Sequence, residues 1–355
     1  METVENCGGK EEYYRKKHRF MIYMVVILIA GFVVFGLSMT VGFYEISFTE
    51  VYETIFNHIT GNIVNYSHDD IIWNTRLPTA IFALIAGASL SIGGAIMQTT
   101  VRNPLADPYT KGIASGASLG ASLSIIVGVT LWEGFNSHES LVTMAFAFSM
   151  IPTAIIMAVS AKKSITPSKM ILVGIAVMYV FSAATSLLML TTTDEQLQEV
   201  YSWNVGSLSA VTWESIPIPF VVCTAAILVL MLQARKINVM MSGPTTARTL
   251  GLNSKRYTLF LLILVSLMTA SVVCFCGTIG FIGLVGPHVA RIFVGSESKY
   301  LIPTSGLIGG LFLLIANDIA KVSGGMGLPV GVVCAVIGCP LFIFILVKMR
   351  KRVWA

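Results

Sequence analysis

Long apolar runs separated by short polar connections form the main pattern of the chain. A helix needs about 20 consecutive apolar residues to cross a lipid bilayer, and most of the runs come close to this length. The third and eighth runs are shorter and rich in glycine. The pattern predicts an all-α membrane protein with about ten transmembrane helices. The runs are 20–41, 77–97, 112–130, 140–161, 169–190, 215–234, 258–276, 281–294, 304–320 and 329–347.

Composition supports this fold class. Of the 355 residues, 55% are hydrophobic and only 12% are charged. Soluble globular domains have about 45–50% apolar and about 25% charged residues. A single water-soluble core cannot bury so much apolar surface, so the composition argues strongly against a soluble enzyme. Disordered, collagen-like and coiled-coil chains are also excluded, because they require high charge or repeats that are missing here.

The beginning of the chain predicts a permanent membrane anchor. The first run, 20–41, is longer than the roughly 7–15-residue apolar region of a cleaved signal peptide, and no A-x-A-like cleavage site follows it. We therefore expect a cytoplasmic tail at 1–19 and a helical membrane domain at 20–350. A second short cytoplasmic tail is expected at 351–355.

Positive charges set the orientation of the spans. Lysine and arginine gather at the cytoplasmic ends of membrane helices, and both ends of the chain carry clusters of them. Two cytoplasmic termini require an even number of spans. Alternation then places all but two of the 23 cations on the cytoplasmic side. The exceptions are Arg76 and Lys321, which fall among acidic outer loops. From charge alone, Arg76 is either a snorkelling anchor at a helix end or a contact for a partner.

Glycine and cysteine favour structural roles. Gly112, Gly116 and Gly120 recur at intervals of four, which lets helix backbones approach closely in lipid. No G-x-x-x-x-G-K-[ST] motif occurs, so the chain has no recognisable means of hydrolysing ATP. Five of the six cysteines lie in apolar runs and no C-x-x-C is present, which predicts small apolar core residues and no metal site.

Prolines and polar residues interrupt two segments. In the segment 102–108, Pro104 and Pro108 rule out a continuous helix and predict a bent, polar turn. In the eighth run, Pro287 precedes His288, the one histidine within an apolar run. His288 could relay protons or bind a ligand. We favour a structural role instead, with a bend and an interhelical hydrogen bond.

The cytoplasmic connection 235–257 contains a predicted short helix at 243–251. Pro244 suits a first helical position, and Gly251 suits a C-terminal stop. A surface helix held between two spans is a natural contact for a cytoplasmic partner. An ordinary amphipathic linker is the alternative.

These motifs together resemble the permease subunits of bacterial iron–siderophore, haem and vitamin B12 ABC importers. The resemblance covers roughly 20–350. It rests on four blocks, namely Arg76-Leu77-Pro78, the segment 102–108 leading to 112–117, the segment 280–291, and the segment 328–332. The family motif residues within the blocks are Asn103, Pro104, Asp107, Pro108, Gly116, Gly283, Pro287, His288 and Arg291.

The resemblance implies a fold, a set of partners and two contact sites. It implies ten helices per subunit and a dimer, with an identical or a related permease, in the bacterial inner membrane. Two cytoplasmic ATPases would use ATP and magnesium, and an extracytoplasmic binding protein would dock from outside. The chain itself would be no enzyme, would bind no cofactor and would have no nucleic-acid partner. Arg76 and Lys321 would contact acidic residues of the binding protein. The ATPase would meet the coupling helix at Thr246, Ala247, Arg248, Leu250 and Gly251.

The chain also departs from the family pattern. Thr79 stands where the family often has a second arginine, and Lys321 stands where arginine is usual. Pro244 replaces a common acidic residue before the coupling helix. The segment from Trp203 to Trp213, with its Gly-Ser-Leu-Ser sequence, resembles the iron-chelate branch. The expected substrate is a ferric siderophore, with haem second and cobalamin third, whereas the residues that would bind it are not identified.

Two other function classes fit the sequence less well than a permease. A proton- or sodium-driven secondary transporter usually places carboxylates deep in its spans, and no aspartate or glutamate falls in the middle of a run here. An intramembrane metalloprotease would need H-E-x-x-H or paired acids on its spans, and the sequence has neither.

Overall fold

The computed structural model describes residues 5–42, 44, 46–132, 134–162, 167–323 and 327–348. The expected C-terminal tail at 351–355 lies outside these residues, as do the first residues of the N-terminal tail and Lys163. Within the described residues the chain is all-helical, with no strand. The expected all-α fold is therefore confirmed.

The helices follow the predicted runs closely. Among the described residues, eight helical stretches are long and apolar enough to cross a membrane, and the third and eighth runs form the shorter apolar helices Ile113–Val127 and Ile282–Val294. The long helices are α1 (Glu5–Ser38), α4 (Leu77–Val101), α6 (Ser137–Lys162), α7 (Pro167–Met189), α9 (Pro217–Leu232), α12 (Ser254–Cys276), α14 (Ser298–Val322) and α15 (Val330–Lys348). The shorter elements are α2 (Phe48–Thr60), α3 (Tyr66–Asp69), η1 (Asp70–Arg76), η2 (Pro108–Lys111), α5 (Ile113–Ser122), η3 (Leu123–Val127), α8 (Asp194–Val205), η4 (Trp213–Ser215), α10 (Ala234–Met241), α11 (Pro244–Thr249) and α13 (Ile282–Val294).

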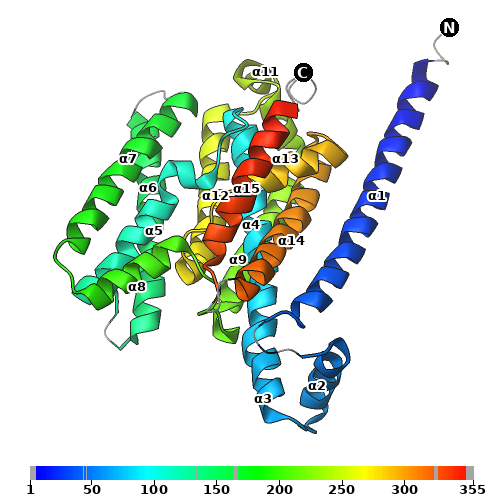
Figure 1. The fold of residues 1–355 in the computed structure, drawn as a ribbon. Helices are drawn as coiled ribbons and strands as arrows, with labels where there is room; N and C mark the ends of the chain where they lie inside the picture. The colour runs from blue at the N-terminus through cyan, green and yellow to red at the C-terminus, as the bar shows by residue number, and fades with distance from the viewer. Residues whose placement is uncertain are drawn as a thin grey trace.

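The start of α1 and the end of α15 lie at the same end of the bundle, as two cytoplasmic termini require (Figure 1). The short helix α11 is also at this end, whereas α2 and α3 project from the opposite, outer end. α1 runs along the edge of the bundle. Most of its apolar side chains are exposed, which is the expected environment of a lipid-facing helix.

α4 forms the centre of the bundle and packs against α12, α13 and α14. Glycine allows these backbones to approach closely. A Cβ atom on Gly87 would lie 2.2 Å from the carbonyl oxygen of Gly309, and one on Gly94 would lie 1.8 Å from that of Gly283. Real Cβ atoms do not come so near. Glycine is therefore required at both crossings, which are of the small-residue type that membrane helices use.

The predicted glycine face of the third run also packs against a neighbouring backbone. A Cβ on Gly116 would lie 2.5 Å from the carbonyl oxygen of Phe148, and one on Gly120 would lie 2.3 Å from that of Met144. Both partners belong to α6. The packing role that the spacing indicated is thus confirmed.

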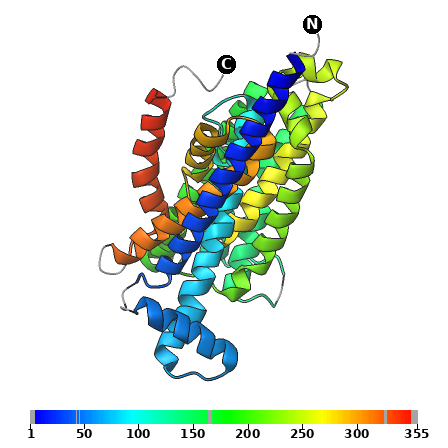
Figure 2. The ribbon, with the colours of Figure 1, turned by 90° about the vertical axis from the view of Figure 1, so that its right-hand side faces the viewer.

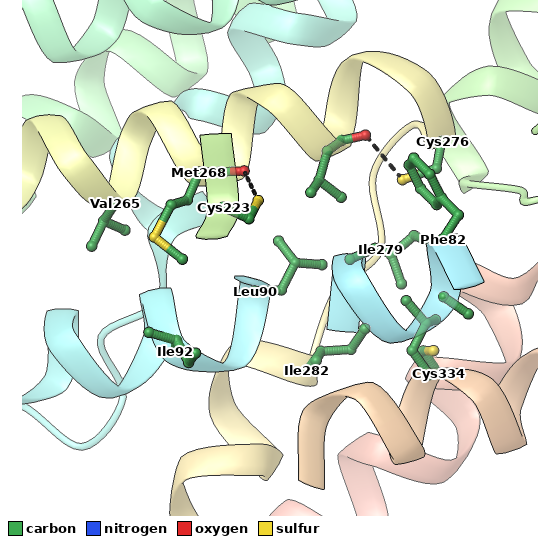
Figure 3. Packing of buried hydrophobic residues seen from close by; sticks show 14 of the residues in the cluster. Phe82, Leu90, Ile92, Cys223, Val265, Met268, Cys276, Ile279, Ile282 and Cys334 are labelled. Carbon is green, nitrogen blue, oxygen red and sulfur yellow. Dashed lines mark hydrogen bonds between the residues drawn. The ribbon is translucent and has the colours of Figure 1, made fainter. Parts of the chain in front are cut away.

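The apolar core fills the space between α4 and its neighbours. Figure 3 shows Phe82 of α4 beside Cys276 of α12, and Leu90 of α4 between Met268 of α12 and Ile282 of α13. Cys223, Cys276 and Cys334 lie among these side chains, buried and without disulfides. Their surroundings match the expected role of small apolar core residues.

We expect Gly94→Ala to destabilise the protein strongly, because the added methyl group meets the backbone of α13, which cannot rotate away. Overpacking of this kind costs about 1–3 kcal/mol and sometimes more. The check is the thermal unfolding midpoint of the purified protein in detergent. Gly280→Ala is the matched control, since nothing lies within 4 Å of a Cβ at Gly280. Equal midpoints for the two variants would contradict the proposed close crossing.

Candidate functional site

Arg76 lies at the outer end of the bundle, where the π-helical turn η1 passes into α4. Its guanidinium donates hydrogen bonds of 2.6 Å to the carbonyl oxygens of Met39 and Tyr44. Both carbonyls belong to the stretch that follows α1, so the arginine connects this stretch to the start of α4. The side chain is only 3% exposed. Arg76 is therefore buried and connects α4 to the end of α1, which is not the geometry of the snorkelling alternative.

Lys321, in the last turn of α14, lies close enough to Arg76 for their charges to interact. The structure thus brings together the two cations that the charge pattern isolated. The Nζ atom of Lys321 is 3.3 Å from Oδ1 of Asp318, one turn earlier on the same helix. Ser38 of α1 donates a 2.6 Å hydrogen bond to the same oxygen. Asp318 was not assigned a role by the sequence motifs, although its i, i+3 spacing from Lys321 is a signal for this pair.

The segment 102–108 forms the bent turn that its prolines predicted. The carboxylate of Asp107 accepts a 2.8 Å hydrogen bond from the backbone N–H of Tyr109 and starts η2. The chain then folds back along α4, since a Cβ on Gly93 would lie 3.3 Å from Pro108. The hydroxyl of Tyr109 accepts a hydrogen bond from the N–H of Ile279. The sequence did not predict that the chain returns into the bundle at this point. The helix that follows, α5, has only 10 residues.

The proline of the eighth run has a specific consequence. Pro287 has no N–H group, so it cannot donate to the carbonyl oxygen of Gly283 one turn earlier. The side-chain amide of Gln98 donates a 3.1 Å hydrogen bond to that oxygen instead. The amide oxygen of Gln98 accepts a hydrogen bond from Arg291. Gln98 is fully buried on α4, and it joins the two halves of the 280–291 block. The sequence motifs did not single it out.

His288 has a structural environment, but with a different hydrogen bond from the one expected. Its Nδ1 donates a 2.7 Å hydrogen bond to the carbonyl oxygen of Leu284, within α13. The predicted interhelical hydrogen bond is therefore wrong, because the contact between helices is an edge-to-face ring contact with Phe342 of α15. Among the described residues, no group of three His, Cys, Asp or Glu side chains could hold a metal ion.

The predicted cytoplasmic helix is present as α11. Pro244 is its first residue, and Gly251 follows it in the left-handed conformation, with φ +79°. Ala247 is completely buried, whereas Leu250 is 66% exposed. Thr246 and Arg248 are also exposed. The helix therefore presents a surface around Leu250 and is fixed to the protein through Ala247.

Hydrogen bonds of the Arg102 and Asn238 side chains connect the α10–α11 segment to the spans. Arg102, at the end of α4, donates to the carbonyl oxygen of Met240, with an N–O distance of 3.1 Å. The side chain of Asn238 accepts a 2.8 Å hydrogen bond from the N–H of Ser298, the first residue of α14. A displacement of this segment would therefore act on the cytoplasmic ends of both α4 and α14.

The sequence from 20 to 348 matches the FecCD transport family. The chain belongs to this family. It is 35% identical to an ABC transporter permease protein of Methanocaldococcus jannaschii, over 97% of this chain and 99% of the relative. It is 31% identical to the hemin transport system permease protein HmuU of Yersinia pestis, over 95% and 96% of the two chains. A solved metal-chelate type ABC transporter in an inward-facing conformation superposes with a TM-score of 0.81, at 26% identity, and covers 92% of this chain and 99% of that one.

This FecCD protein is therefore a multi-pass permease subunit of an ABC importer, located in the inner membrane. ATP hydrolysis belongs to a separate subunit of such importers. The described geometry divides the FecCD chain into an outer end, with Arg76, Lys321 and Asp318, and a cytoplasmic end, with α10 and α11. The motif residues Asp107, Gly283 and Arg291 lie between these ends and hold α4 against α13 and the returning connection.

Proposed function

We propose that this permease imports ferric siderophores as part of a dimer, driven by two cytoplasmic ATPases and supplied by an extracytoplasmic binding protein. The observation that carries the proposal is the family match along 20–348, which includes all four motif blocks. The outer Trp203–Trp213 segment, which resembles the iron-chelate branch, supports the choice of substrate. In this segment Trp213 donates a hydrogen bond to the carbonyl oxygen of Trp73, so it is tied to the outer end of the α3–η1–α4 helix.

The relatives include permeases named for iron compounds and a permease named for cobalamin. Beside the hemin permease, an Fe(3+)-citrate import permease of Bacillus subtilis is 32% identical over 95% of this chain and 98% of its own length. A cobalamin permease of Halobacterium salinarum is 35% identical, but over 79% and 74% of the two chains. These identities are too similar to rank the substrates alone. Haem stays the second candidate and cobalamin the third.

A deletion strain supplied with one iron source at a time tests the substrate. We expect loss of growth on at least one ferric siderophore, restored by the intact gene, and unchanged use of haem and cobalamin. The direct measurement is uptake of the labelled ferric chelate into the same cells. Unchanged uptake of every siderophore together with lost haem or cobalamin uptake would contradict the siderophore assignment while leaving the importer assignment intact.

The proposed contact with the ATPase is the exposed face of α11. Leu250 stands out from this face, and Thr246 and Arg248 flank it. A leucine with so much exposed surface gains free energy by entering an apolar cleft in a partner. Buried Ala247 and the hydrogen bonds of α10 would carry the resulting force to α4 and α14.

We expect Leu250→Asp to weaken binding of the ATPase to the permease and to remove most of the uptake activity. The reason is that a carboxylate would replace an apolar contact in a desolvated cleft. The measurements are co-purification of the ATPase and uptake by intact cells. Leu190→Asp is the matched control, since Leu190 is also a largely exposed leucine but lies just after the outer end of α7. It should leave ATPase co-purification unchanged. Normal assembly in the Leu250 variant would refute the proposed contact.

The proposed contact with the binding protein is centred on Lys321. The guanidinium of Arg76 already donates hydrogen bonds to two backbone carbonyls. Its role would therefore be to add positive electrostatic potential to the outer surface and to hold the end of α1 in place. The Lys321 side chain is 20% exposed, and its ammonium contacts one carboxylate oxygen of Asp318, which also accepts a hydrogen bond from Ser38. Exposed ion pairs contribute only about 0.2–1 kcal/mol each. In a dimer they would set the orientation and association rate of the partner more than its affinity.

We expect Lys321→Gln to slow association of the binding protein at low salt and to reduce the salt dependence of that rate. Glutamine can still donate a hydrogen bond to Asp318, so the fold should be retained. Lys299→Gln is the control at the opposite, cytoplasmic end of the same helix. Surface plasmon resonance on the reconstituted permease measures the association rate of the binding protein at low and at high salt. If both variants associate like the wild type, Lys321 is only the partner of Asp318.

A further inference from the structure

The helix α2, outside the membrane spans, is strongly defined by its own sequence. Ser47 and Glu50 form a capping box at its start, and Gly61 ends it in the left-handed conformation, with φ +76°. Hydrogen bonds from Ser47 lower the pKa of Glu50, so the capping carboxylate stays charged at neutral pH. Such caps hold a short helix together even where few tertiary contacts support it.

One side of α2 is fixed against the α3–η1 segment. α2 contacts both α3 and η1, and Val51 of α2 is completely buried. The Nδ1 atom of His58 lies 2.8 Å from Oδ1 of Asp69, and its ring stacks on Trp73 with 3.8 Å between centroids. These contacts prevent the helix from rotating about its axis. The other sides of α2 therefore point in fixed directions relative to the bundle.

An adjacent side of α2 is apolar and uncovered. Phe48, Tyr52, Phe56 and Ile59 recur at intervals of three and four residues, which places them in one stripe along the helix. Their exposed fractions are 53%, 41%, 67% and 71%. We call these four residues the α2 stripe. Exposed apolar patches of this kind mark contact with a partner or a membrane.

The α2 stripe continues the exposed surface of α1. A Cβ on Gly36, in the last turns of α1, would lie 2.7 Å from the hydroxyl of Tyr52 and 3.6 Å from the ring of Phe48. An open crevice between the two helices is lined by residues that include Leu37 and Phe48. Figure 2 shows α2 lying across the outer end of the bundle, not along the spans. The stripe thus begins where the lipid-facing side chains of α1 end.

We propose that α2 is an interfacial helix that inserts the α2 stripe into the outer leaflet of the bilayer. An amphipathic helix lying in the membrane plane buries its apolar face at the boundary between headgroups and acyl chains. The polar side of α2 carries Glu50 and Glu53, and the helix contains no lysine or arginine. Its insertion therefore relies on apolar burial, and anionic lipid is not required. The membrane would then fix the outer end of α1, which Arg76 clamps.

A depth measurement on the full-length permease tests this proposal. The variants carry p-acetylphenylalanine at position 56 or 59, coupled to a nitroxide, so the native cysteines stay unchanged. The protein is reconstituted into phosphatidylcholine vesicles, and its accessibility to oxygen and to the nickel complex Ni-EDDA is measured by electron paramagnetic resonance. Nitroxides at positions 53 and 57, on the polar side of α2, are the matched controls.

We expect oxygen to relax positions 56 and 59 more than Ni-EDDA does, and the reverse at positions 53 and 57. Added phosphatidylglycerol should leave this pattern unchanged. Ni-EDDA accessibility at 56 and 59 equal to that at 53 and 57 would overturn the proposal. Loss of accessibility to both reagents at 56 and 59, only when the binding protein is added, would also overturn it and assign the stripe to protein docking. Neither result depends on the substrate or on the coupling helix.

Discussion

The whole bundle depends on the close backbone contact between α4 and its neighbours α13 and α14. Lipid removes most of the hydrophobic driving force between membrane helices, so their association relies on close van der Waals packing and on hydrogen bonds. Gly87 and Gly94 of α4 provide the first, because their missing Cβ atoms let carbonyl groups of α14 and α13 lie directly against the α4 backbone. Gln98, one turn beyond Gly94, provides the second.

The same constraint explains why the polar residues of the motif blocks are buried in pairs. A backbone carbonyl without a hydrogen-bond donor destabilises the fold where water is absent. Pro287 creates such a carbonyl at Gly283, and Gln98 satisfies it. At the outer end, the carbonyls after α1 are satisfied by Arg76. Pro287 thus leaves a backbone carbonyl without its usual N–H donor, whereas Arg76 supplies N–H donors to backbone carbonyls.

The two ends of the bundle are connected through the central helix. α4 begins after Arg76, beside the site proposed for the binding protein, and ends before Arg102, which contacts the carbonyl of Met240 just before α11. α14 likewise runs from Ser298, bonded to Asn238, to Lys321. Two neighbouring rigid helices therefore reach from one proposed contact to the other. This arrangement suits a permease that must couple events on opposite sides of a membrane.

The sequence by itself determined the helical fold, the approximate bounds of the spans, the common side of the termini and the ends of α11. These follow from local properties, because apolar run length, lysine and arginine placement, Pro244 and Gly251 act within a few residues of their own position. It also isolated Arg76 and Lys321 by charge.

Only the tertiary structure decided which partners these residues have. The acceptor for Arg291 is Gln98, which is far away in the chain, and the partners of Arg76 are carbonyls after a different helix. The hydrogen bond of His288 stays within α13, and the chain after the segment 102–108 returns into the bundle. A hydrogen-bond donor pairs with whichever acceptor the packed helices bring within about 3 Å. That choice depends on how whole helices cross, which no local pattern in the sequence specifies.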